Sequence, residues 1–100
     1  MSNNNNNDAL STVRFEIRVT EAVLEDLAAS LERVRGLHSR ARNAAAAAAD
    51  AGDDAVYIRE TRAAEAYDVE HDLLHRRMVD AVGTLGSLRF RVLTRAGSAR

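Results

Sequence analysis

Three histidines are the side chains of this chain most able to do chemistry. His71 and His75 are four residues apart, so in a helix they share one face. Asp68 stands one helical turn before His71. If the chain folds back about Gly52, His38 lands close to the level of His71. The spacing therefore allows a group of imidazole and carboxylate side chains.

Imidazoles and carboxylates are ligands that zinc accepts, which makes His38, His71 and His75 metal-binding candidates. The Glu between the two histidines of a zinc-protease helix is missing here. Histidines at such positions more often mark the boundary of an amphipathic helix. We therefore expect no metal and no other cofactor.

No other group of residues indicates catalysis. Carboxylate pairs such as Glu60 and Glu65 match a solvated helix face. No glycine-rich loop, activated nucleophile or cluster of aromatic residues accompanies them. We therefore expect a protein that is not an enzyme.

The composition favours a protein that is stabilised by a partner chain. One hundred residues make one domain at most, and 19 of them are alanine, which buries little surface. Small chains of this kind usually add disulfides, a metal or a partner, and there is no cysteine. The net charge of −1 gives no drive toward nucleic acid or an anionic membrane. No apolar run is long enough to span a bilayer.

The first twenty residues predict a tail and an arm. Residues 1–11 are polar and rich in asparagine, so we expect a disordered tail. They have neither the basic nor the apolar part of a signal peptide, and we expect a cytoplasmic protein. Over 13–19 apolar and charged residues alternate, which is typical of a half-buried strand or an extended arm. Thr20 follows at a position suited to capping a helix.

The remainder predicts an antiparallel hairpin of two helices. Apolar residues three and four apart begin at Leu24, which predicts a helix over about 20–50. The sequence Asp50-Ala-Gly-Asp-Asp54 reads as a stop, a turn and a new cap. A second helix is expected over about 54–94, followed by a frayed tail over 96–100. The predicted fold class is thus all-α, with a hairpin domain over 12–95.

A hairpin of two amphipathic helices leaves an apolar face uncovered, and pairing with a second hairpin into a four-helix bundle would cover it. The chain is therefore expected to form a homodimer or a heterodimer with another helical hairpin. The residues predicted to form this interface lie on the apolar stripes of the two helices: Leu24, Leu27, Leu31, Val34, Tyr67, Leu74, Met78, Leu85 and Leu88.

The overall form of the chain resembles one known family. A short extended lead over 15–19, a cap at Thr20, a helix beginning at Glu21, a central turn and a second long helix make up about 100 residues. This form resembles the WXG-type (ESX, type VII secretion) helical hairpin proteins of actinobacteria. The resemblance implies a four-helix bundle dimer, service as a partner of larger effectors, and secretion by a leaderless, ATP-driven route.

A shorter segment favours an alternative. Residues 14–27, with Gly36-Leu-His-Ser39 after them, look like a ribbon-helix-helix DNA-binding repressor or antitoxin. In that family the strands of a dimer form a ribbon that enters the major groove. The resemblance would make Arg14, Glu16 and Arg18 the base readers, and Ser39 a cap near a phosphate.

Overall fold

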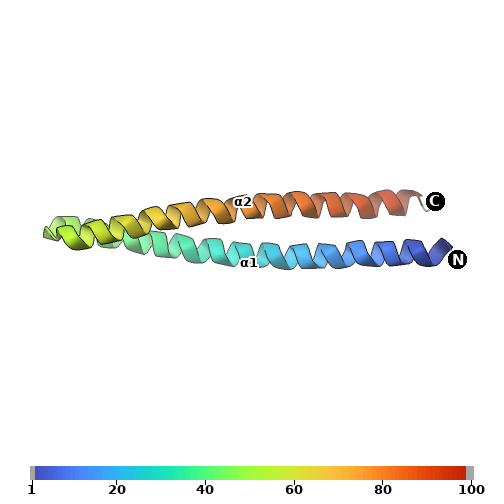
Figure 1. Ribbon diagram of the computed structural model, residues 1–100, viewed down its shortest axis with the longest axis horizontal. Coiled ribbons are helices and arrows are strands. Elements are labelled where there is room, and N and C mark those ends of the chain that lie inside the picture. Colours follow the sequence, from blue (N-terminus) through green and yellow to red (C-terminus); the bar gives the residue numbers. More distant parts are fainter. Residues whose placement is uncertain (1, 99–100) are drawn as a thin grey trace. The chain divides into compact units, whose positions relative to one another are not determined.

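The structure, a computed structural model, describes residues 2–98, which form two long antiparallel helices joined by a tight turn (Figure 1). Helix α1 spans Ser2–Ala51 and helix α2 spans Asp54–Ser98. Residues 2–98 contain no strand. The predicted all-α hairpin with a central turn is confirmed.

Each of two compact units pairs a segment of α1 with a segment of α2. The turn unit is Leu27–Arg77, which includes the connection between the helices. The terminal unit joins the chain up to Asp26 with the chain from Met78 onward. Both units therefore contain a two-helix core of their own.

The turn is built as the sequence predicts. Gly52 has a φ of 72°, a left-handed conformation that glycine adopts without a steric penalty. The Gly52 amide donates to the Ala49 carbonyl at 3.2 Å and the Asp53 amide donates to the Ala48 carbonyl at 2.9 Å. These two bonds form a Schellman motif, which satisfies carbonyls at the end of α1. Asp53 then caps α2, because its Oδ1 accepts from the Val56 amide at 3.2 Å.

The two helices meet along seams that repeat every seven residues. The side chains of these seams are spaced alternately three and four apart, and all are buried or half-buried. Such a repeat is the pattern of a coiled coil, here with its two strands antiparallel. The seam of α1 consists of Val13, Ile17, Thr20, Leu24, Leu27, Leu31, Val34, His38, Ala41, Ala45 and Ala48. The seam of α2 consists of Glu60, Ala64, Tyr67, His71, Leu74, Met78, Ala81, Leu85, Leu88 and Val92.

The side chains that fill the seam become larger with distance from the turn, and Leu31 and Val34 are already buried within the turn unit. Near the turn the buried residues are small: Ala41, Ala45, Ala48 and Ala64. Alanine favours helix and allows two helices to approach closely, but contributes little apolar burial. The terminal unit instead buries Val13, Leu85 and Leu88. Larger apolar side chains therefore hold together the part of the hairpin that lies away from the turn.

The predicted extended arm over 13–19 is wrong, because α1 is helical through these residues. In a helix Val13 and Ile17 fall on the seam, while Phe15 and Val19 point away from it. Thr20 is not a cap either, since its hydroxyl donates to the Glu16 carbonyl at 2.8 Å within the helix. The alternation of residue types fits both a strand and a helix, and no Pro or Gly separates 13–19 from the helix that follows.

The helices also extend beyond the predicted boundaries. Helix α1 begins at Ser2, so the asparagine run has a helical backbone where a disordered tail over 1–11 was expected. Helix α2 ends at Ser98, inside the range 96–100 that was predicted as a tail. Residues 1, 99 and 100 of the predicted tails lie outside the described part of the chain.

Candidate functional site

The residues predicted to form a dimer interface all lie on the seam between the two helices of one chain. Leu31, Val34, Leu85 and Leu88 are buried there. The half-buried members of the predicted set are Leu24, Leu27, Tyr67, Leu74 and Met78. The hairpin itself thus covers much of this surface, and the role of these residues toward a second chain stays a prediction.

A different set of apolar residues is exposed in the terminal unit. On α1 this set is Phe15, Val19 and Val23, four residues apart, which we call the α1 outer stripe. On α2 it is Val79, Val82, Phe90 and Leu93, which we call the α2 outer stripe. Phe90 and Leu93 are 69% and 71% exposed, and Phe15 is 59% exposed. The sequence reasoning missed both stripes, although their helical spacing was a signal for a second apolar face.

The two outer stripes lie on opposite sides of the terminal unit. One side is marked by Glu21 of α1 and Arg89 of α2, whose Oε2 and Nη2 atoms are 3.7 Å apart. Val82 is two helical turns before Arg89 and so lies on that same side. Val23 follows Glu21 by two residues, a rotation of about 200°, which places it on the other side of α1. The α1 outer stripe and the α2 outer stripe therefore face opposite sides of the terminal unit.

The helix segments that carry the stripes have opposite charge. Residues 8–26 of α1 contain five acidic and two basic residues. Residues 79–95 of α2 contain one acidic and three basic residues. The α1 segment is therefore acidic and the α2 segment basic, but Arg91 follows Arg89 by two residues, about 200° around α2, and so lies away from the α2 outer stripe.

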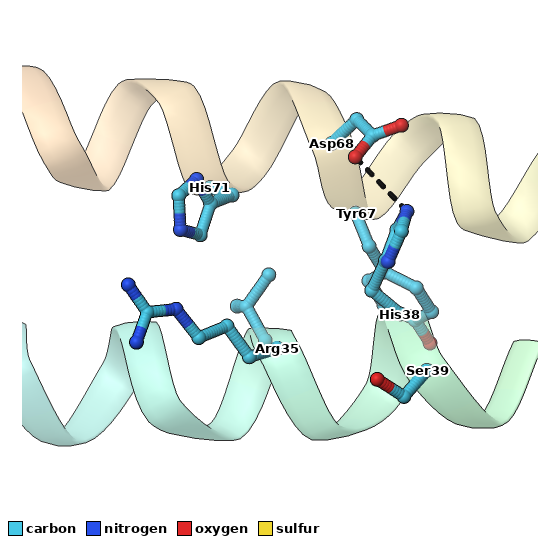
Figure 2. A pocket seen from close by; sticks show the side chains of 7 residues that line it. Arg35, His38, Ser39, Tyr67, Asp68 and His71 are labelled. Carbon is cyan, nitrogen blue, oxygen red and sulfur yellow. Dashed lines mark ion pairs between the residues drawn. The ribbon is translucent and has the colours of Figure 1, made fainter.

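The turn unit holds a polar pocket around the histidines (Figure 2). Its open space of about 320 Å³ lies between the two helices. The side chains of His71 from α2 and Arg35 from α1 face this space, and His38 points across it toward Asp68 (Figure 2). Val34, Ser39 and Tyr67 complete the lining. The seam is thus interrupted by polar groups at this level.

A short polar contact in the pocket joins His38 Nε2 and Asp68 Oδ1, which are 2.9 Å apart. The distance is within hydrogen-bonding range, but Nε2 is buried without a hydrogen bond, so the pair does not meet the angular requirement of one. It becomes an ion pair when the imidazole carries a proton.

His71 and His75 stack on the same face of α2, as their spacing predicts. Their ring centroids are 6.4 Å apart and their planes differ by 13°. The His71 Nδ1 atom is 4.0 Å from Asp72 Oδ1. Within residues 2–98 no three or more histidine, cysteine, aspartate or glutamate side chains come together as a metal-binding group. His38, His71 and His75 are therefore not arranged around one common point.

The residues of the DNA-binding alternative are all exposed. Arg14, Glu16 and Arg18 lie on α1, and Ser39 lies inside the same helix, so it is not the cap of a second one. These positions form part of a continuous helix surface and not a strand.

Comparisons of the chain with protein-family models, with curated proteins and with solved structures found no match. Over the described residues, neither helix is long and apolar enough to cross a membrane.

Proposed function

We propose that this chain is a non-enzymatic interaction module that binds another helical hairpin through its outer stripes. The observation that supports the proposal is the set of seven large apolar side chains exposed in the terminal unit. Single exposed apolar residues are common on proteins, whereas several on one face of a helix, as in each outer stripe, usually mark a contact with another molecule. Covering an apolar stripe gains about 25 cal/mol for each Å² of apolar area removed from water, before the entropy cost of association is subtracted.

The finer part of the proposal follows from the resemblance to WXG-type proteins. The length of the chain, its two long helices and its central turn support that resemblance. We propose a dimeric protein associated with type VII secretion, which resides in the cytoplasm and leaves it by a leaderless route. In such a complex two hairpins would bring four helices together.

The ribbon-helix-helix alternative depends on a strand over 13–19. The helical backbone at these residues provides no ribbon for a DNA groove. The exposed apolar residues of the same segment, Phe15 and Val19, favour a protein partner over a phosphate backbone.

The proposal is tested by comparing what the native chain and a stripe variant bind in an extract of the source cells. The variant carries Phe90→Glu and Leu93→Glu, which change only exposed side chains. The expected result is a helical protein of similar size, either a second copy or another chain, that is retained by the native chain alone. The retained protein must then re-form the complex with the native chain when each has been purified separately. Equal retention by native chain and variant would contradict the proposal.

A further inference from the structure

We infer that His71 and His75 together bind one divalent transition-metal ion on α2. The ion is of the class that imidazole ligands accept, such as Zn²⁺, Ni²⁺ or Cu²⁺. The site uses two of the three histidines, and water completes the coordination, so no group of three protein ligands is needed. Metal binding at this place goes beyond the proposed function and does not depend on it.

The two imidazole rings lie side by side on one face of α2. His71 and His75 are four residues apart, their ring centroids are separated by 6.4 Å, and their planes differ by 13°. An imidazole nitrogen binds zinc at about 2.0–2.1 Å. A rotation about the side-chain bonds can therefore bring one nitrogen of each ring within reach of a common ion, while the helix backbone keeps its place.

Both rings are accessible to an ion from solvent. His75 is exposed, and the side chain of His71 is half-buried, with 32% of its surface accessible. His71 also faces the open space between the two helices of the turn unit (Figure 2). Solvent can therefore deliver the ion and provide the ligands that the protein does not.

A carboxylate beside His71 favours a bound cation. The Oδ1 atom of Asp72 is 4.0 Å from Nδ1 of His71, so the other ring nitrogen, Nε2, is left for the ion. A carboxylate on the far side of a metal-bound imidazole makes the ring a better ligand and holds its orientation. Arg35 faces the same pocket, but its Nη1 atom is 3.9 Å from Oε2 of Glu32, which partly offsets its charge.

The third histidine lies outside this site and provides a control. His38 is on α1, and its Nε2 atom is buried beside Asp68. A nitrogen that solvent does not reach is not available to an ion from solution. The variant His38→Gln should therefore keep the metal site, whereas His71→Gln and His75→Gln should each lose it.

The test titrates each purified chain with ZnCl₂ and with NiCl₂ at neutral pH by isothermal titration calorimetry. The native chain and His38→Gln are expected to bind one ion per chain. His75→Gln changes an exposed side chain and should weaken binding at least about tenfold, because two ligands on one face bind an ion far more tightly than one. MgCl₂ should not bind, since Mg²⁺ prefers oxygen ligands. Circular dichroism verifies that each variant keeps its helix content.

A matched variant tests the spacing of the two rings. It carries His75→Gln together with Arg76→His, which keeps three histidines but moves one of them off the shared face of α2. This variant should bind Zn²⁺ as weakly as His75→Gln alone. Thermal unfolding gives a second readout, because an ion that binds only the folded chain raises the Tm as its concentration grows. Zn²⁺ should raise the Tm of the native chain and of His38→Gln, but not that of His75→Gln.

Four results would overturn the metal site. They are a native chain that binds neither ion, equal affinity in the native chain and His75→Gln, full binding by the variant with Arg76→His, and loss of binding in a folded His38→Gln variant. The proposed function is decided separately, since the extract experiment changes only residues of the α2 outer stripe.

Discussion

His38 and Asp68 meet across the two helices of the turn unit with 2.9 Å between Nε2 and Oδ1. The imidazole occupies a seam position, and its Nε2 atom is buried without a hydrogen bond. A buried polar atom that makes no hydrogen bond lowers stability, by about 1–3 kcal/mol in proteins. The contact with the largely exposed Asp68 carboxylate offsets only part of this loss. The seam is therefore less stable at His38 than it would be with an apolar side chain at that position.

The variant His38→Leu is expected to raise the free energy of unfolding by about 1 kcal/mol at neutral pH, because leucine fills a seam position without a polar atom. Urea unfolding followed by circular dichroism measures this change. Asp68→Asn is the matched variant, and it should lower stability by less than about 0.5 kcal/mol, because Asp68 is largely exposed. A destabilised His38→Leu variant would show that the imidazole contributes more than its burial costs.

The cap at the start of α2 is expected to contribute measurably to stability. Asp53→Ala removes the carboxylate that accepts from the Val56 amide and should lower the free energy of unfolding by about 1 kcal/mol. Asp50→Ala, at the end of α1, removes a negative charge from the end of the helix where the dipole disfavours it. This control should leave stability unchanged or raise it slightly. Equal losses in both variants would argue against capping by Asp53.

Two glycines of the turn unit are expected to respond to alanine in opposite ways. Gly36 lies inside α1, and a methyl group there meets no heavy atom within 4 Å. Gly36→Ala should therefore raise stability by about 1 kcal/mol. Gly52 has a φ of 72°, so Gly52→Ala should lower stability by about 1–2 kcal/mol. Thermal unfolding of both variants checks the pair, and shifts in the same direction would contradict the assigned turn geometry.

The seam is expected to tolerate no charge at its buried positions. Leu31 is 6% exposed, and Leu31→Asp should lower the free energy of unfolding by at least about 3 kcal/mol, since it removes apolar burial and places a carboxylate among apolar groups. Circular dichroism should show a loss of helix. Val69→Asp, at a position that is 62% exposed, should retain the native spectrum. A well-folded Leu31→Asp monomer would contradict the role of this seam.

The sequence was sufficient to predict the hairpin because its signals reinforce one another. Gly52 between aspartates marks the turn, and leucines three and four apart mark the helix before it. Over 13–19 the alternation of residue types is ambiguous between strand and helix. Whether residues 13–19 form a strand or a helix depends on the seam of α2. Val13 and Ile17 bury their side chains against that seam only if α1 is helical through them. Local patterns carry no information about that partner surface.

The candidate site was less predictable for two physical reasons. Phe15 and Val19 were assigned to an arm, and Phe90 fell outside the inward stripe, so neither outer stripe was recognised. The level of His38 was expected to match that of His71, and both residues do line one pocket. The closest polar partner of His38 is nevertheless Asp68. That choice depends on how each helix is rotated about its own axis, which residue spacing along one helix does not determine.

The short connection at Gly52 and Asp53 has a consequence for how the chain folds. Side chains that meet near the turn are close in sequence, whereas Glu21 and Arg89 of the terminal unit are separated by most of the chain. Closing a small loop costs less entropy than closing a large one, and local contacts speed folding. We therefore expect the alanine-rich end next to the turn to form first, and the pairing to proceed from there toward both termini. The outer stripes, which lie in the terminal unit, would then be completed last.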